Sequence, residues 1–200
     1  MGLPAHNHRF YTVSEYLELE RQTGIKYEYE EGEVFAMAGG TVVHSLIGGN
    51  AVSELRRVLK NRPCNAYNSD LKIAVNEEKY RYADASVICG AAEYFEENPE
   101  AAKNPLLIVE VLSESSELYD RGEKFKTYRR IPGFREYILI EQRYPLVEVF
   151  FKVDDKTWQY RAYEQLDQII QLGSIEAEIS MEEIYSGVTF DEYLPNNSTR

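Results

Sequence analysis

The segment from Leu106 to Leu112 constrains the fold more than any other, because it is apolar at every position except Glu110. A strand that is apolar on both faces is typical of the centre of a sheet with layers on both sides. A carboxylate there costs several kcal/mol unless a cation lies beside it. The segment therefore predicts a covered central strand with a basic side chain or a metal ion next to Glu110.

Helical and strand patterns alternate along the rest of the chain. Thr12-Val13-Ser14-Glu15 is a capping box that predicts a short helix to about Glu20. A strand pair is expected around the turn at Glu31-Gly32, and a long helix from Gly39-Gly40-Thr41 to about Leu59. The other expected elements are strands at 66–75, 82–88, 136–140, 147–153 and 158–163, a hairpin turn at 76–79, a helix with Asp120 as N-cap that ends before Pro132, and a short last helix capped by Ser180.

This order predicts one α/β (α+β) domain over residues 1–200. We expect its core at about 12–190, with tails at 1–10 and 195–200. No apolar run approaches the roughly 20 residues of a membrane-spanning helix, and the start of the chain lacks a secretory pattern. Cys64 and Cys89 lie far apart in the sequence and form no C-x-x-C pair, so no structural zinc site is expected. Together these features predict a cytoplasmic protein without membrane contact.

The formal net charge of -12 argues against a protein that holds DNA by charge alone, which would carry a basic patch or a basic total. Basic residues do gather in two runs, Arg56-Arg57-Lys60-Arg62 and Lys124-Lys126-Arg129-Arg130. A nuclease with this charge requires that basic side chains share one face and that metal ions offset the carboxylates of the site.

Two further residues join Glu110 in a candidate site. Asp84 stands at the start of the strand before the Glu110 strand, so in an antiparallel pair the two carboxylates converge. Two oxygen ligands with room for water suit Mg²⁺ or Mn²⁺. Lys124 lies on the helix that follows, near the end of the Glu110 strand. There it would orient water or neutralise charge that develops on phosphorus.

Each of these residues also has a structural interpretation. Asp84 taken alone is a turn or edge residue, Lys124 a solvated surface lysine, and Glu110 half of a buried ion pair with Arg121 or Lys124. Two weaker candidates lie elsewhere. Asp70 and Lys72 read as a surface pair on one strand face. Glu54 is either an extra metal ligand or a side chain at the edge of the apolar stripe of its helix.

Three segments together resemble the Uma family of putative restriction endonucleases: Asp84-Ala85-Ser86-Val87-Ile88, the run from Leu107 to Ser116, and Asp120-Arg121-Gly122-Glu123-Lys124. The resemblance extends from about Thr12 to Phe151. That family belongs to the PD-(D/E)XK superfamily, which implies a restriction-endonuclease-like core with a mixed central β-sheet flanked by helices.

The resemblance also implies roles for residues. Asp84 would be the motif aspartate and Glu110 its acidic partner, and Lys124 would replace the lysine that normally stands at Leu112. Glu33 and His44 match further family positions, and Glu33 is a candidate third carboxylate. This chain has Ala83 where the family usually has proline, and Ile138 where it often has tryptophan; neither change removes a ligand.

The sequence therefore predicts a Mg²⁺- or Mn²⁺-dependent endonuclease that acts on DNA, with Glu33, Asp84, Glu110 and Lys124 as catalytic residues and with Asp84 and Glu110 as metal ligands. Since cleavage of both strands usually takes two sites, a homodimer is expected. Two other functions fit the same pattern: a catalytically inactive binding or scaffold module with a nuclease fold, and a hydrolase of another phosphate ester.

Overall fold

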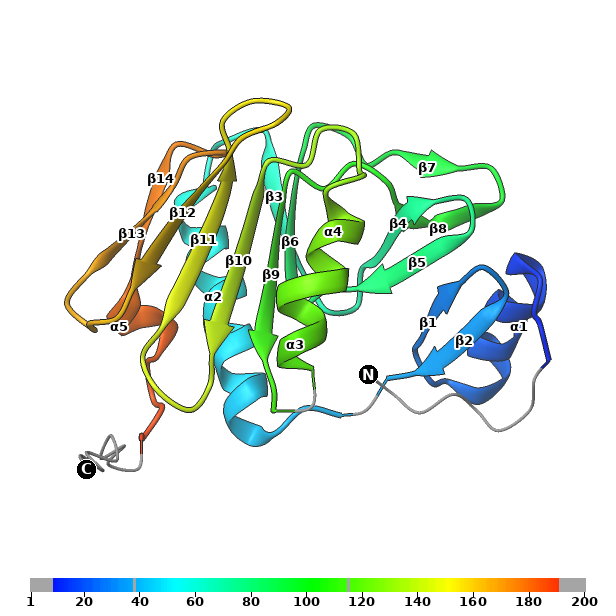
Figure 1. Cartoon of the computed structure of the whole chain (residues 1–200), viewed down its shortest axis with the longest axis horizontal. Coiled ribbons are helices and arrows are strands. Elements are labelled where there is room, and N and C mark those ends of the chain that lie inside the picture. Colours follow the sequence, from blue (N-terminus) through cyan, green and yellow to red (C-terminus); the bar gives the residue numbers. More distant parts are fainter. Residues whose placement is uncertain (1–8, 38, 115, 191–200) are drawn as a thin grey trace, which may run out of the picture.

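The computed structural model describes residues 9–37, 39–114 and 116–190. A mixed six-stranded sheet in the order β12-β11-β10-β9-β6-β3 forms one half of the molecule (Figure 1). Its strands are β3 (Cys64–Asn68), β6 (Ala85–Cys89), β9 (Leu107–Leu112), β10 (Glu136–Glu141), β11 (Val147–Lys152) and β12 (Trp158–Tyr163). All six residues of β9 are buried. This strand pairs parallel with β10 and antiparallel with β6. The predicted covered central strand is confirmed.

Helices cover both faces of this sheet (Figure 1). One face packs against α2 (Val42–Val58), α5 (Met181–Ile184) and the hairpin of β13 (Ile169–Leu172) and β14 (Ala177–Ser180). The other face packs against a helical segment composed of α3 (Glu117–Tyr119), the π-helical turn η1 (Asp120–Lys124) and α4 (Phe125–Tyr128). Because side chains alternate along a strand, Glu110 lies on the second face with Ile108 and Leu112.

A second six-stranded sheet, in the order β2-β1-β5-β4-β8-β7, lies beside the first. Its strands are β1 (Tyr27–Glu30), β2 (Glu33–Ala36), β4 (Lys72–Asn76), β5 (Lys79–Tyr82), β7 (Tyr94–Phe95) and β8 (Asn98–Ala102). Helix α1 (Val13–Thr23) packs on one face of this sheet through Tyr16, whose ring stacks on Tyr29 and Tyr80 at centroid distances of 5.0 and 5.8 Å.

Two of the expected strands are wrong, since each is divided between the two sheets. The segment expected as one strand at 66–75 ends as β3 at Asn68 and begins again as β4 at Lys72. The Asn68 side chain accepts from the N–H of Asp70, a local turn that stops the strand. The segment at 82–88 likewise passes from β5 to β6 across Ala83 and Asp84. Asp84 therefore stands where the chain crosses between the sheets.

The caps at Thr12 and Ser180 are confirmed, because both hydroxyls accept from N–H groups of the first helical turn. The expected N-cap at Asp120 is wrong. Its helical segment begins after Ser116, so Asp120 lies in mid-segment, and its side chain is buried. The pattern Asp-x-x-Glu resembles a capping box, but here Asp120 faces Lys124 across one turn, with Oδ1 3.5 Å from Nζ.

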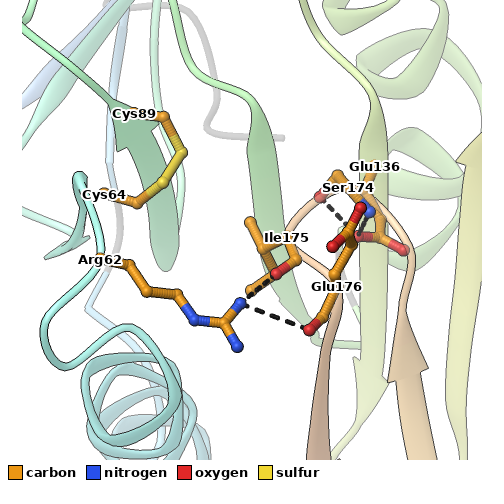
Figure 2. The surroundings of a disulfide bond; sticks show 7 residues. All are labelled: Arg62, Cys64, Cys89, Glu136, Ser174, Ile175 and Glu176. Carbon is orange, nitrogen blue, oxygen red and sulfur yellow. Dashed lines mark hydrogen bonds between the residues drawn. A yellow bond between two sulfur atoms is a disulfide. The ribbon is translucent and has the colours of Figure 1, made fainter.

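Cys64 and Cys89 form a disulfide, although they are 25 residues apart in the sequence. The antiparallel pairing of β3 with β6 places them directly opposite each other. Close to this bond, Arg62 donates to the carbonyl oxygens of Ile175 and Glu176, in the turn between β13 and β14 (Figure 2). A cytoplasmic location was expected partly because the two cysteines lie far apart in the sequence. Since the fold brings them together in a disulfide, their separation no longer supports a reducing compartment.

Residues 1–8 and 195–200 of the expected tails lie outside the described residues. Arg9 and Phe10 are exposed, as expected for the end of the first tail. None of the helices in the described part of the chain has the length and apolar character needed to cross a membrane.

Candidate active site

A cleft of about 1310 Å³ opens where the two sheets meet α2 and the helical segment 117–124. It lies at the C-terminal end of β9 and at the crossing between β5 and β6, so chain segments that are distant in the sequence share its wall. Its charged and polar lining includes Glu28, His44, Asp84, Glu110, Glu114, Asp120, Lys124, Gln142 and Arg143. The fold therefore brings three of the predicted catalytic residues, Asp84, Glu110 and Lys124, into one cavity.

Glu110 is 3% exposed and takes part in two polar contacts on the face of β9 toward α3–α4. Its Oε1 lies 2.8 Å from Nζ of Lys124 and accepts a hydrogen bond of 2.9 Å from the hydroxyl of Tyr128. Burial raises the pKa of Glu110 well above its usual range. Lys124 opposes this rise, and the charges of Asp120 and Asp84 add to it. The alternative of a buried ion pair with Lys124 is thus part of the structure.

Lys124 is 7% exposed, which excludes its interpretation as a solvated surface lysine. Besides Glu110, its Nζ lies 3.5 Å from Asp120 and 3.8 Å from Glu28, and donates to the carbonyl oxygen of Tyr82 at 3.4 Å. Burial lowers the pKa of Lys124, but the three carboxylates outweigh it and hold that pKa well above its ordinary value. Lys124 is therefore a charged ammonium group with carboxylates on several sides.

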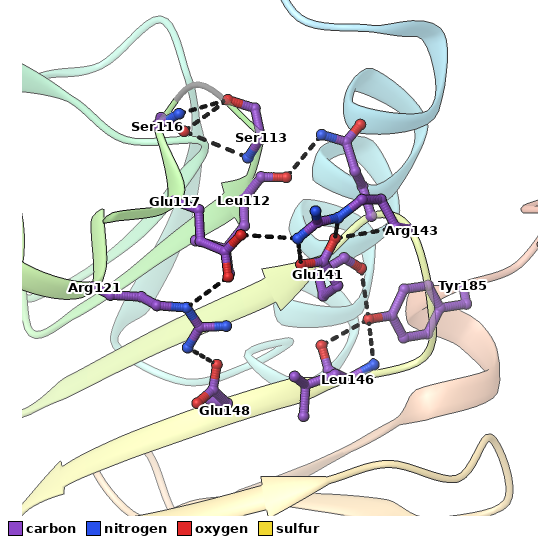
Figure 3. Close-up of polar contacts among 11 residues, drawn as sticks. Leu112, Ser113, Ser116, Glu117, Arg121, Glu141, Arg143, Leu146, Glu148 and Tyr185 are labelled. Carbon is purple, nitrogen blue, oxygen red and sulfur yellow. Dashed lines mark hydrogen bonds and ion pairs between the residues drawn. The ribbon is translucent and has the colours of Figure 1, made fainter. Parts of the chain in front are cut away.

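A π-helical turn carries Lys124 into the cleft. Residues 120–124 form this turn, and π turns inside helices are frequent at functional sites. Ion pairs fix the turn to the sheet (Figure 3). Arg121 pairs with Glu117 one turn earlier and with Glu148 on β11, and Glu117 also accepts from Arg143, two residues after β10. The position of Lys124 relative to β9 thus depends on this network.

Asp84 is held from two sides. Its Oδ2 accepts from the N–H of Val111 at 2.7 Å, and its Oδ1 lies 2.9 Å from Nε2 of His44. The hydrogen bond to Asp84 raises the pKa of His44, although burial opposes the rise. His44 sits in the first turn of α2, where its N–H donates to the N-cap hydroxyl of Thr41. His44 and the N–H of Val111 therefore hold the two carboxylate oxygens of Asp84.

The structure does not bring all the candidates to the cleft. Glu33 is exposed on β2, opposite Glu30, and does not line the cavity. Glu54 is buried on α2, but both of its oxygens accept from Arg57, and it too lies outside the lining. The interpretation of Asp70 and Lys72 as a surface pair is wrong. Asp70 pairs with Lys26, whereas Lys72 is buried and pairs with Glu20.

Glu28 is a site residue that sequence reasoning missed. It lies on β1, where Tyr27 and Tyr29 point into the core beneath α1 and Glu28 points the other way, into the cleft. The alternation of tyrosine and glutamate from 27 to 30 was the available signal, because period-two alternation separates the two faces of a strand. It could not be used without knowing that this second face meets the helical segment 117–124.

The carboxylates at this end of the cleft suit a divalent cation. Burial and the charges of Asp120 and Asp84 raise the pKa of Glu110, and a divalent cation near these carboxylates would oppose that rise. Among the described residues, no three His, Cys, Asp or Glu side chains are arranged to hold a metal by themselves. Asp84 and Glu110 fit an ion such as Mg²⁺, which keeps several waters and takes one or two carboxylates along with substrate phosphate.

Comparisons with known proteins agree with this fold. The family model described as "Uma2: Putative restriction endonuclease" matches residues 13–182. A crystal structure of a putative nuclease belonging to DUF820 from Anabaena variabilis has the same fold, with a TM-score of 0.68 and 22% identity over 88% of this chain and 98% of that chain.

Two uncharacterized proteins of Synechocystis sp. are similar in sequence. The protein slr1290 is 35% identical over 177 residues, which are 88% of this chain and 92% of that protein. The protein sll1609 is 36% identical over 148 residues, 74% of this chain and 84% of that protein. With a family model that matches most of its length, the chain belongs to the Uma2 family of putative restriction endonucleases.

Proposed function

We propose that this protein is a metal-dependent endonuclease that hydrolyses phosphodiester bonds of DNA. The observation that carries the proposal is the buried pair of Glu110 and Lys124 in a cleft that also contains Asp84. A buried ion pair is often no more stabilising than apolar residues of similar volume. Its presence beside an open cleft therefore favours a role in chemistry. Membership of the Uma2 family supports the same activity.

Asp84 and Glu110 would hold Mg²⁺ or Mn²⁺, and the bound ion would polarise the phosphoryl oxygens and lower the pKa of a water molecule. The protein's own contribution is orientation and charge. His44 and the N–H of Val111 fix the carboxylate of Asp84. Lys124, which is 7% exposed, would place an ammonium group where negative charge develops on phosphorus.

The proposal extends to the setting in which the enzyme works. A DNA substrate favours a cytoplasmic location, and cutting both strands of a duplex calls for a homodimer with two sites. Sedimentation of the purified protein, alone and with a DNA duplex, tests the dimer.

The net charge of -12 favours the rival function, an inactive binding or scaffold module.

Nicking of supercoiled plasmid is the decisive experiment. The wild-type protein should nick the plasmid with Mg²⁺ or Mn²⁺ and not with EDTA, and Glu110→Gln and Asp84→Asn should each reduce the rate by about 100-fold or more. A folded wild-type protein that leaves plasmid and both single- and double-stranded oligonucleotides intact with either metal would contradict the endonuclease function and favour the scaffold function. Cleavage of small phosphodiesters alone would establish a different hydrolase.

A further inference from the structure

Glu28 connects the catalytic lysine to the second sheet. Its side chain is 15% exposed and lines the cleft from β1. One carboxylate oxygen lies 3.8 Å from Nζ of Lys124, and the other lies 3.5 Å from Nε of Arg81 on β5. Lys124 belongs to the helical segment that covers the first sheet. Glu28 therefore spans the two sheets at the point where the cleft opens between them.

Arg81 gives Glu28 a rigid anchor. It is 1% exposed, and its guanidinium group donates to the carbonyl oxygens of Tyr29 and Tyr80 at 2.9 and 3.0 Å and pairs with Glu30. Its Nε has no hydrogen-bond partner among the described residues and lies near the carboxylate of Glu28. Because its guanidinium group is buried and bound to two backbone carbonyls of the second sheet, the position of Arg81 does not depend on the helical segment that carries Lys124. The carboxylate that pairs with it is held in place as well.

The other carboxylates near Lys124 cannot fix its position in the same way. Asp120 lies on the same helical turn as Lys124, so its carboxylate does not tie Lys124 to another element. Glu110 is the nearest partner at 2.8 Å, but it is also a proposed metal ligand. A divalent cation at Glu110 would repel the ammonium group and occupy the oxygens that now receive it. Lys124 would then require another counter-charge that does not move with its own helix.

We propose that Glu28, anchored by Arg81, is a positioning residue that holds Lys124 in the cleft when Glu110 is engaged by the metal ion. This inference rests on the proposed function, because it assigns Glu28 a part in the same hydrolysis. In this proposal, Glu28 and not Glu33 is the carboxylate that the β1–β2 hairpin contributes to the site, because Glu28 lines the cleft and Glu33 does not.

Glu30 provides a matched control. It lies on the same strand two positions later and pairs with the same Arg81, but its other partner is Lys79 and it has no contact with Lys124 among the described ion pairs. Glu28→Gln and Glu30→Gln each remove one carboxylate from Arg81 without a change of volume. A purely structural role of the Arg81 network predicts equal effects of the two variants. A positioning role predicts an effect that is specific to Glu28.

Two measurements test the proposal. In plasmid or oligonucleotide cleavage, Glu28→Gln should lower kcat by about 10-fold or more with KM nearly unchanged, and Glu28→Asp should restore part of the loss. Glu30→Gln should stay within about 3-fold of wild type. In the second measurement, an amine-reactive reagent labels the folded protein and mass spectrometry follows Lys124. With Mg²⁺, labelling of Lys124 should rise several-fold in Glu28→Gln and remain at the wild-type rate in Glu30→Gln.

The two readouts separate this proposal from the proposed function. If wild-type protein cleaves nothing, the endonuclease function fails, and the labelling of Lys124 still tests Glu28. Equal labelling in Glu28→Gln and wild type, or equal loss of kcat in Glu28→Gln and Glu30→Gln, would overturn the positioning role. Thermal melts of each variant establish that the proteins compared are folded.

Discussion

Lys124 and Lys126 stand two positions apart on the same helical segment, yet their surroundings differ. Lys124 is buried among carboxylates, whereas Lys126 is exposed and pairs with Glu123. Lys124→Ala should remove most DNA cleavage and spare Mg²⁺ binding, because an ammonium group supplies charge and not ligation. Lys126→Ala should cleave plasmid nearly as wild type does. Loss of activity in Lys126→Ala with retention in Lys124→Ala would refute the assignment. Plasmid nicking and the thermal shift with Mg²⁺ measure both properties.

Glu110 should make the protein less stable as the pH rises, because its pKa is higher in the folded state than in the unfolded state. Burial raises its pKa in the folded protein above the unfolded value near 4.5. Protonated Glu110 therefore contributes to the stability of the folded state, and this contribution is fully present below about pH 4.5. That gain is lost as the pH rises through the folded pKa. Glu110→Gln keeps the shape without this titration, so its free energy of unfolding should fall less between pH 4.5 and 8 than that of wild type.

Thermal melts across this pH range test the effect. Wild type should also be stabilised by Mg²⁺, whereas Glu110→Gln should not, because an amide is a poor ligand for this ion. His44 and Glu136 also have raised pKa values, so the difference between the two proteins, and not the wild-type curve, is the informative quantity. A large loss of stability in Glu110→Gln at every pH would mean that the carboxylate serves only as half of a structural pair.

At the level of secondary structure, elements with local signals were predictable and junctions were not. The cap at Thr12, the turn at Glu31-Gly32 and the apolar run of β9 are encoded within a few residues. The crossings at 69–71 and 83–84 are not, because period two says which face a side chain occupies and not which sheet the strand joins. The strands β7, β8, β13 and β14 were not predicted. In β13, exposed and buried residues alternate, but Ile169 and Ile170 are both apolar, so the sequence does not show that alternation.

The ion-pair network around Arg121 should hold the π-helical turn on the sheet. Arg121→Met keeps most of the side-chain volume but leaves Glu148, which is buried on β11, without its cation. We expect a loss of about 2 kcal/mol in the free energy of unfolding, measured by urea denaturation, and slower cleavage because Lys124 lies on this turn. Lys126→Met removes an exposed pair and should cost less than about 0.5 kcal/mol.

A double variant shows whether the unpaired charge causes this loss. Arg121→Met with Glu148→Gln removes both charges, so it should be more stable than Arg121→Met alone, since no buried carboxylate is left without a partner. The hydroxyl of Tyr160 can still donate to the amide oxygen that replaces the carboxylate. A double variant less stable than the single one would show that the network acts through packing.

For the whole molecule, Asp84, Glu110 and Lys124 could be grouped from the sequence because they follow one another along adjacent elements. Glu28 could not, because it lies on a different sheet, 56 positions before Asp84, and reaches the site only through the tertiary fold. Glu33 was assigned on the family pattern alone, and the hairpin register places it opposite Glu30 at an exposed position. Residues that act through contacts between sheets leave little trace in local patterns.

The overall charge determines how the protein should bind DNA. Of the cations that line the cleft, Lys26, Lys124 and Arg143 pair with carboxylates. Arg56 pairs with no carboxylate among the described residues and donates to the carbonyl of Ala66. With so few free cations on a chain of net charge -12, few phosphates are neutralised. The plot of log K against log salt concentration should therefore be shallow, with a slope of about -1 to -3.

Fluorescence anisotropy of a labelled duplex with Lys124→Ala, which should bind without cutting, measures this slope in Mg²⁺. Arg56→Gln should reduce the magnitude of the slope by about 1, as expected for the loss of one phosphate contact. Lys60→Gln is the control, because Lys60 is exposed just beyond the same helix and does not line the cleft. EDTA should abolish binding, since without the metal the carboxylates of the cleft repel the backbone. A slope steeper than about -5, or tight binding in EDTA, would mean that DNA docks on a different, broader basic face of the molecule.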